Sequence, residues 1–314
     1  MLDKNDGVLS RVRNQAVDYA YDRKGRINRQ FIDSNDTHQE YSYTWLDTGV
    51  HQTFSCNGID YGSDIYTDAL GRMTSENISL QFGNLQRSIT YLPGEQTDEH
   101  KANGKCKTDA TTNLVNQITY TGGRTLSYTY DDEERINRVA DSSGNTIEYT
   151  YDSLGRLVSE TVGNTQVNTM TYDAYGNILT KNGVQYEYDT VWKDRLVKVG
   201  SDTITYDLQG NPTSYKGHTL TWKNDRMMSY DSNTYTYDCN GIRTSKTVSG
   251  VTHTYELDGS IIIKETWGNN QLVPMYDITG SVLGILHNNT PYYFMRNLQG
   301  DVIGVVNNSG ILKW

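Results

Sequence analysis

The sequence predicts an all-β protein: an array of antiparallel β-hairpins that forms one long curling sheet. Three observations predict this fold. The dipeptide Tyr-Asp occurs nine times in 314 residues, at steps of 16 to 21 residues where the array is regular. The chain has 28 glycines, which suit tight turns, but only 4 prolines, which interrupt strand pairing. It has 25 tyrosines and 4 phenylalanines, and tyrosine fits half-buried strands because its ring is buried while its hydroxyl stays in water.

The repeating unit has the frame Tyr-Asp-x-x-Gly, usually followed by arginine or asparagine. Aspartate at the first position of a turn and glycine three residues later are typical of a type I turn. The carboxylate can accept a backbone N–H two residues on, and the glycine can take a positive φ, which gives a hairpin with a bulge. The predicted turn residues are Tyr21, Asp22, Gly25, Tyr151, Asp152, Gly155, Arg156, Tyr172, Asp173, Gly176, Tyr206, Asp207, Gly210, Tyr276, Asp277 and Gly280.

Variants of the frame extend the array. Thr67-Asp68-Ala69-Leu70-Gly71-Arg72 replaces the tyrosine, and Tyr130-Asp131-Asp132-Glu133-Glu134-Arg135 replaces the glycine with glutamate. The arginines near the turn glycines are expected to pair with aspartates of neighbouring turns and so to fix the register, each pair contributing about 0–1 kcal/mol. These arginines are Arg26, Arg72, Arg156 and Arg243.

The repeat organises the chain into segments. We expect an unassigned end at 1–14, degenerate repeats at 15–92, a polar loop or insertion at 93–115, regular repeats at 116–281, and more apolar closing strands at 282–314. No segment has the 3.6-residue apolar period of an amphipathic helix. A single array therefore accounts for the whole chain, and no domain boundary is predicted.

Charge and hydropathy exclude several classes of protein. The 28 basic and 38 acidic residues give a net charge of −10, which argues against nucleic-acid binding and against docking on anionic lipid. No run of 18 apolar residues is present, so we expect no membrane insertion. The N-terminus has no basic region followed by an apolar stretch, so we expect no signal peptide: either the protein is cytosolic or the chain is a piece of a longer secreted one.

No catalytic, cofactor or metal site is predicted. The carboxylates at 131–134 are interpreted as a solvated turn rather than an acid–base pair, and the turn aspartates lack the spacing of a calcium loop. The histidines form no zinc motif, and the three cysteines, Cys56, Cys106 and Cys239, cannot all pair within one chain and show neither zinc nor redox spacing. Aromatic rings, including Trp192 and Trp222 near the tyrosine position, are interpreted as packing between repeats; a glycan groove stays open as the alternative.

The array, together with the run 292–304 (YYFMRNLQGDVIG), resembles the Rhs/YD-repeat family and the start of its Rhs-associated core segment. The resemblance covers about 15–310. It implies a long β-sheet that spirals into a hollow shell, or cocoon. In bacterial members the shell holds a C-terminal toxin, which is released after self-cleavage by aspartates near the end of the core. Because the chain stops at Trp314, we expect a truncated member.

The sequence thus favours a non-enzymatic scaffold, a segment of a shell that encloses or presents a toxin in bacterial competition. The implied partners are a C-terminal toxin cargo that this chain lacks, with immunity or secretion proteins, and the implied location is secreted or cell-wall associated. The alternative is a cell-surface carbohydrate-binding or adhesion protein, because choline-binding repeats have a similar period and aromatic hairpins. Those repeats use paired tryptophans, and this chain has 5 tryptophans.

Overall fold

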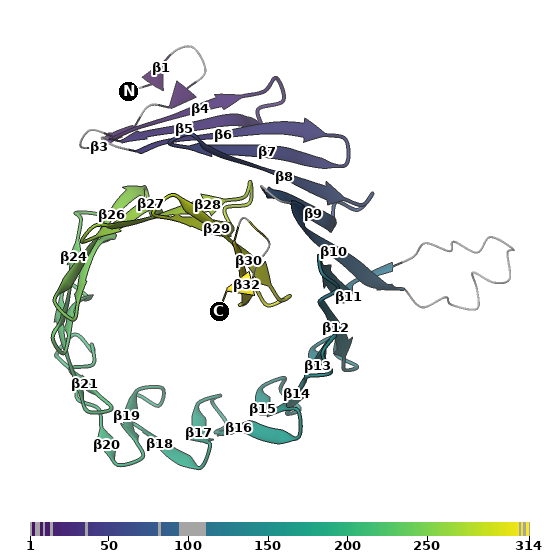
Figure 1. Cartoon of the computed structure of the whole chain (residues 1–314). Coiled ribbons are helices and arrows are strands. Elements are labelled where there is room, and N and C mark those ends of the chain that lie inside the picture. Colours follow the sequence, from purple (N-terminus) through teal and green to yellow (C-terminus); the bar gives the residue numbers. More distant parts are fainter. Residues whose placement is uncertain are drawn as a thin grey trace, which may run out of the picture. The chain divides into compact units, whose positions relative to one another are not determined.

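The computed structural model describes residues 2–3, 7–8, 10–12, 15–34, 37–80, 83–93, 111–307, 309 and 312–313. These residues form strands joined by turns and contain no helix, so none of them forms a helix that could cross a membrane. Figure 1 shows hairpin following hairpin along the chain. The predicted all-β hairpin array is confirmed.

Each strand pairs antiparallel with the strand that follows it, from β3 to β20 and again from β21 to β32. The strands are β1 (Leu2–Asp3), β2 (Gly7–Val8), β3 (Ser10–Val12), β4 (Gln15–Tyr21), β5 (Ile27–Ser34), β6 (Thr37–Leu46), β7 (Gly49–Cys56), β8 (Ile59–Thr67), β9 (Met73–Leu80), β10 (Gly83–Pro93), β11 (Thr111–Tyr120), β12 (Thr125–Tyr130), β13 (Ile136–Asp141), β14 (Thr146–Tyr151), β15 (Leu157–Val162), β16 (Thr165–Tyr172), β17 (Ile178–Lys181), β18 (Val184–Tyr188), β19 (Leu196–Val199), β20 (Asp202–Thr203), β21 (Ser214–Tyr215), β22 (His218–Lys223), β23 (Arg226–Tyr230), β24 (Asn233–Tyr237), β25 (Arg243–Val248), β26 (Val251–Asp258), β27 (Ile261–Trp267), β28 (Asn270–Tyr276), β29 (Val282–His287), β30 (Thr290–Arg296), β31 (Val302–Asn307) and β32 (Leu312–Lys313).

Two compact units share this architecture. Unit 1 consists of Met1–Tyr128, Asp141–Ser143 and Leu272–Trp314, and unit 2 of Thr129–Ala140 and Gly144–Gln271. No boundary was predicted from the sequence, and the four boundaries between these units all fall inside the run of repeats expected at 116–281. The polar segment expected at 93–115 is strand at both ends, because Pro93 closes β10 and β11 starts at Thr111; residues 94–110 lie outside the described part of the chain.

The core of unit 1 lies on one face of β6 to β8. Tyr41, Phe54 and Tyr61 are cross-strand neighbours, and their side chains are buried. The ring centroids are 4.7 Å apart for the first pair and 5.2 Å for the second, so the three rings form a continuous apolar row across the strands. Alternation with period 2 explains the pattern, since successive side chains of a strand point to opposite faces.

Strands from the C-terminal part of the chain cover this row. The Tyr41 hydroxyl donates a hydrogen bond to the Pro274 carbonyl (3.4 Å), and Gln52 Nε2 donates one to the Tyr276 carbonyl (2.5 Å). The ring of Tyr293 on β30 lies 6.0 Å from that of Tyr61. Unit 1 is therefore built from two sheet segments far apart in sequence, which bury their apolar faces against each other.

Tyr120 and Arg124 form further hydrogen bonds between the N-terminal sheet and the C-terminal strands of unit 1. The Tyr120 hydroxyl accepts a hydrogen bond from the Arg296 backbone N–H (2.8 Å) and donates one to the Arg296 carbonyl (2.7 Å). Arg124 Nη1 donates a hydrogen bond to the Ile303 carbonyl (3.0 Å). The segment expected to form closing strands thus contributes β29 to β32, and β30 and β31 are fixed to the N-terminal sheet through their backbone.

Unit 2 has shorter strands, and one of its faces carries paired hydroxyl groups. Thr150 pairs with Ser159 (2.6 Å) across β14 and β15, and Thr221 pairs with Ser229 (2.7 Å) across β22 and β23. The opposite face of the same hairpins carries the tyrosines of the repeat, such as Tyr151. The two faces of this ribbon therefore differ in chemistry, one hydroxylated and one aromatic.

Candidate functional site: the aspartate corners and their latches

The corner at Asp152–Arg156 shows how each repeat turns. The backbone N–H of Gly155 donates a hydrogen bond to the Asp152 carbonyl (2.9 Å), and the Asp152 N–H donates one to the Arg156 carbonyl (3.0 Å). Gly155 has φ = 77°, a left-handed conformation that favours glycine. The pairing register shifts between Thr150 and Tyr151, which marks a bulge. This geometry matches the type I turn with a bulge expected from the Asp-x-x-Gly spacing.

The aspartate carboxylate holds the corner from both of its oxygens. Asp152 Oδ1 accepts hydrogen bonds from the backbone N–H groups of Leu154 (2.9 Å) and Arg156 (3.0 Å). Asp152 Oδ2 accepts one from Arg156 Nε (2.7 Å), and Nη2 of the same guanidinium also lies 2.7 Å away. Four charge-assisted contacts therefore converge on one carboxylate.

The same arrangement recurs at other corners. Asp22, Asp68 and Asp131 each bind the arginine four residues on. At Asp173 and Asp207 an asparagine amide takes the place of the guanidinium, at 2.9 and 3.0 Å. In six corners the residue four positions after the aspartate binds the second carboxylate oxygen, arginine in four and asparagine in two: Asp22–Arg26, Asp68–Arg72, Asp131–Arg135, Asp152–Arg156, Asp173–Asn177 and Asp207–Asn211. We call these six corners completed.

The hydrogen bonds stabilise the charged form of the corner aspartates. The backbone N–H of Arg156, followed by its side chain, holds the pKa of Asp152 below its usual value. At Asp189 the pKa falls to about 2, because the backbone N–H of Trp192 and then the Arg195 side chain bind the carboxylate. Such carboxylates are fixed as hydrogen-bond acceptors and are poor proton donors or acceptors near neutral pH.

A second set of contacts joins each repeat to the preceding one. The Tyr172 hydroxyl donates a hydrogen bond to the backbone carbonyl of Leu157 (2.6 Å), the residue directly after the previous corner. A bulge interrupts the regular ladder there, so its carbonyl can accept a side-chain donor. We call this contact a latch. Among the described residues, latches run from Trp45 to Ile27, Tyr91 to Met73, Tyr151 to Ile136, Tyr172 to Leu157, Tyr188 to Ile178, Tyr206 to Leu196, Trp222 to Pro212 and Tyr237 to Met227.

The corner arginine lies over the ring of the latch. The Arg156 guanidinium carbon is 4.6 Å from the centroid of Tyr172, and its Nη1 donates a hydrogen bond to the backbone carbonyl of Asp173 (2.9 Å). Arg26 over Trp45, at 4.7 Å, and Arg72 over Tyr91, at 4.1 Å, repeat the stacking. One guanidinium therefore binds the carboxylate of its own corner and the aromatic ring of the next repeat.

The prediction that the arginines pair with aspartates of neighbouring turns is wrong. Arg26, Arg72 and Arg156 bind the carboxylate of their own corner, because the turn brings the fifth residue back beside the first. Arg243 lies one residue beyond the corner position, which Ile242 occupies. Its guanidinium carbon lies over the rings of Tyr235 and Tyr255, at 5.6 and 5.7 Å.

Three of the tryptophans lie at a latch or at a corner tip. Trp222 forms a latch, as its place near the tyrosine position indicates, whereas Trp192 lies at a corner tip and is 58% exposed. Trp45 also forms a latch, which the sequence reasoning missed. The spacing in the sequence could have indicated this latch, because Trp45 lies 18 residues after Ile27, the same step as from Met73 to Tyr91.

The carboxylates at 131–134 have structural roles where their contacts are described. Asp131 holds a corner, and Glu133 binds Arg135 at 2.7 Å. Among the described residues, no group of three or more histidine, cysteine or acidic side chains could hold a metal ion. The polar groups of the corners are therefore held by hydrogen bonds and ion pairs, and their role is to fix the turns.

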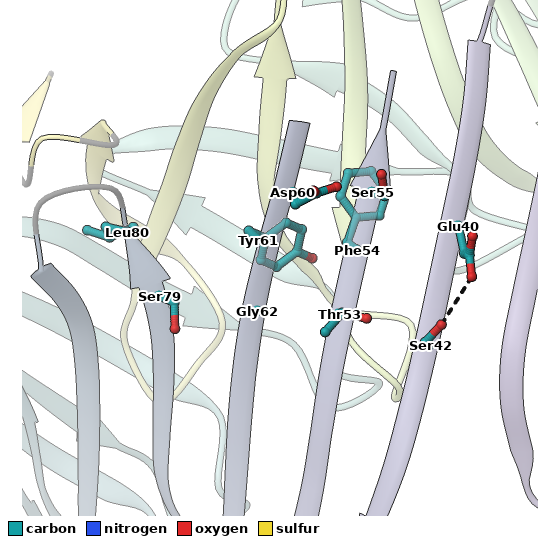
Figure 2. Close-up of a pocket in the computed structure, with 10 residues that line it drawn as sticks. All are labelled: Glu40, Ser42, Thr53, Phe54, Ser55, Asp60, Tyr61, Gly62, Ser79 and Leu80. Atoms are coloured by element: carbon teal, nitrogen blue, oxygen red, sulfur yellow. Dashed lines mark hydrogen bonds between the residues drawn. The ribbon is translucent and has the colours of Figure 1, made fainter. Parts of the chain in front are cut away.

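A groove lies on the polar face of β6 to β9, opposite the buried aromatic row of unit 1. It has a volume of about 720 Å³, and its lining includes several hydroxyl and carboxylate groups, with Glu40 beside Ser42 at one side (Figure 2). Glu40 also binds Arg29, at 2.9 Å. The aromatic residues of the lining, Phe54 and Tyr61, are only 1% and 6% exposed, so they offer no platform on which a sugar ring could stack.

Comparison with known proteins identifies relatives of the repeat. A family model described as Teneurin YD-shell matches residues 97–191. The tRNA3(Ser)-specific nuclease WapA of Bacillus spizizenii is 28% identical over 129 residues, which are 37% of this chain and 6% of that protein. The chain thus matches a small fraction of this relative's length.

Some solved structures also match most of this chain at low sequence identity. One is TcdB2-TccC3-TEV, with a TM-score of 0.49 and 12% identity over 95% of this chain and 21% of that chain. Another is the Tc holotoxin pore of Photorhabdus luminescens, with a TM-score of 0.30 and 15% identity over 94% of this chain and 22% of that chain.

Proposed function

Because the chain belongs to the Rhs/YD-repeat family, we propose that it is a wall segment of a repeat shell that encloses or presents a C-terminal toxin. The observation that carries this proposal is the series of latches. Each described latch ties a repeat to the one before it through a backbone carbonyl, so the wall holds together locally and needs no central core. A hollow enclosure requires a wall of this kind.

The wall itself has no catalytic role in this proposal. Corner aspartates with lowered pKa values and the arginines that bind them serve as joints. The relative WapA carries the name of a nuclease, and the matched segment covers 6% of it, so that activity is not transferred to this chain. Enclosure of a toxin for use in bacterial competition, with secretion from the producing cell, completes the proposal.

Protease protection tests the enclosure. The product of the whole source locus, including any coding sequence downstream of this segment, is compared with the isolated downstream domain under the same protease. We expect the enclosed domain to survive a protease concentration that digests the isolated domain. Equal cleavage of the two would contradict enclosure.

A corner variant makes the test specific to the wall. Asp152→Ala removes the acceptor of a completed corner, whereas Asp132→Ala changes an exposed position at a corner tip. The first substitution should shorten the protection time and the second should leave it unchanged. If both variants protect like the wild type, the latched wall does not provide the protection.

The groove of Figure 2 favours a second candidate function, adhesion to a glycan of the cell surface. Hydroxyl and carboxylate groups such as Ser55 and Asp60 can bind the hydroxyls of a sugar. A glycan array probed with the 314-residue chain tests this role. Binding that disappears in Asp60→Ala would support it, and absence of binding at high protein concentration would remove it.

A further inference from the structure

The corner at Asp277 lacks the side chain that completes the six corners described above. Its fifth residue is Ser281, where those corners have arginine or asparagine. Asp277 Oδ1 accepts hydrogen bonds from the backbone N–H groups of Thr279 (2.8 Å) and Ser281 (2.9 Å) and from the Thr279 hydroxyl (2.6 Å). Within the described part of the chain nothing donates to Oδ2, although Asp277 is only 8% exposed. This oxygen can therefore accept a donor from a ligand.

Glu76 brings a second such oxygen from the N-terminal sheet of unit 1. Glu76 on β9 is 5% exposed, and its Oε2 lies 3.1 Å from Arg87 Nη2. Its other oxygen, Oε1, is buried and accepts no hydrogen bond from the described residues. A buried carboxylate oxygen without a donor is unusual, because desolvation of the charge is then uncompensated.

Two arginines at the same place have donors without acceptors. Nε of Arg87 and Nε of Arg296 are buried and bond to no acceptor in the described residues. Other atoms of these guanidinium groups contact protein: Arg87 Nη2 reaches Glu76 and Met73 Sδ (3.0 Å), and Arg296 Nη2 donates to the Val282 carbonyl (2.6 Å). The Arg296 guanidinium carbon also lies 5.7 Å from the centroid of the Phe294 ring. The site therefore combines unsatisfied acceptors and unsatisfied donors.

All four charged residues line one cavity of about 230 Å³ in unit 1. The N-terminal sheet contributes Glu76 and Arg87, and the C-terminal strands and turns contribute Asp277 and Arg296. Thr279 and Ser281 add hydroxyl groups to the lining. The volume is below the roughly 300–1,000 Å³ typical of pockets for drug-sized ligands, so the cavity suits a molecule of a few heavy atoms.

The charges restrict the chemistry of that molecule. Two carboxylates face two guanidinium groups, so a simple cation or anion would add an uncompensated charge in a buried site. Burial raises the pKa of Glu76, the arginines oppose the shift and Asp277 adds to it; the nearby Tyr120 has a pKa raised by burial. A net-neutral ligand with one charge of each sign satisfies both sets of groups.

We propose that this cavity is a binding site for a small zwitterion of the α-amino acid class. The ligand ammonium donates to Glu76 Oε1 and Asp277 Oδ2, in the role that a corner arginine has elsewhere. The ligand carboxylate accepts from Nε of Arg87 and Nε of Arg296. Binding bridges the N-terminal sheet and the C-terminal strands of unit 1, so it also strengthens their docking.

Ligand-detected NMR of the 314-residue chain tests the proposal, with L-alanine as the zwitterion and propionate and isopropylamine as ligands that each carry one charge. We expect saturable binding of L-alanine, and binding at least about tenfold weaker for each single-charge ligand, because each loses a charged contact. A melting temperature that rises with L-alanine but not with either single-charge ligand is the second expected result. No saturable binding of L-alanine, or equal binding of all three, would overturn the proposal.

Ser281→Arg is the decisive variant, because it gives Asp277 the guanidinium that completes other corners and removes no acidic group. It should abolish L-alanine binding without lowering the melting temperature. Glu76→Gln, which keeps the shape of the side chain, should weaken binding at least about tenfold and provides an independent result if the first variant is unstable. Asp207→Asn is the control at a completed corner and should bind like the wild type. Wild-type affinity in both cavity variants would also overturn the proposal.

Discussion

The hydroxyl of Tyr172 lies 2.6 Å from the backbone oxygen of Leu157, fifteen residues earlier in the chain. This hydrogen bond joins two repeats through a side chain on one and a backbone group on the other. The acceptor belongs to the main chain, so the contact requires only an aromatic donor at the right distance. Trp45 and Trp222 accordingly replace tyrosine with an indole N–H.

Tyr172→Phe removes the latch hydrogen bond and keeps the ring. The expected loss in the free energy of unfolding is about 1 kcal/mol, the usual net contribution of a neutral hydrogen bond. Urea unfolding of the 314-residue chain measures it. Tyr175→Phe is the matched control, because Tyr175 lies at a corner tip and is 75% exposed. Equal stability of the two variants would show that the latch does not contribute to stability.

Glu134→Gly should stabilise the protein. Glu134 has φ = 62°, at the position where the other completed corners have glycine. A side chain in this conformation costs about 1 kcal/mol or more relative to glycine, so removing it should raise the free energy of unfolding by about that amount. Asp132→Gly, two residues earlier in the same turn, is the control and should not stabilise. Chemical unfolding of both variants decides between these outcomes.

Gly284→Ala should destabilise unit 1. A Cβ at Gly284 would lie 2.2 Å from the Tyr292 carbonyl oxygen and 2.8 Å from Met275 Cε, so neighbouring strands would have to separate. Overpacking of this kind typically costs about 1–3 kcal/mol. At Gly62 a Cβ would have its nearest neighbours at 3.7 Å, an ordinary contact distance, so Gly62→Ala serves as the control. Similar thermal unfolding of the two variants would contradict the close approach at Gly284.

Stability should fall with acid in a defined range of pH. The folded pKa of Asp189 is about 2, below the value of about 3.9 for a free aspartate. Such a group stabilises the fold above the unfolded pKa, and this contribution is lost as the pH falls toward the folded pKa. Melting temperatures measured from pH 5 to pH 2 should therefore decrease.

Asp189→Asn tests the assignment of that decrease. The amide keeps an acceptor at Oδ1 but does not titrate, so the variant should lose less of its melting temperature between pH 4 and pH 2. Asp132→Asn, at an exposed position of a corner tip, should follow the wild-type profile. An Asp189→Asn profile that coincides with the wild type would exclude this carboxylate as a source of the acid sensitivity.

The geometry of the turns could be predicted from the sequence, but the partners of some side chains could not. Asp152 and Gly155 define the corner because a turn depends on a few consecutive residues. The partner of Arg156 could not be deduced, since aspartates of its own and of neighbouring turns were both plausible. The turn returns the fifth residue to the first, which only the folded backbone makes evident.

The packing of the C-terminal strands of unit 1 against its N-terminal sheet could not be predicted from the sequence pattern either. Alternation along β6 indicates that Tyr41 faces away from water, but it does not say which strand covers it. The covering residue, Pro274, is 233 positions away. The cavity at Glu76 and Asp277 depends on this docking, so no spacing motif could have predicted it.

Every described latch reaches back toward the N-terminus, from a later aromatic residue to an earlier carbonyl. During synthesis on the ribosome, each emerging hairpin therefore meets an acceptor that has already been made. The repeats can therefore fold one after another during translation, because each latch needs no segment that has yet to be synthesised. Unit 1 is the exception, because its N-terminal sheet stays uncovered until β28, more than 200 residues later, has been made.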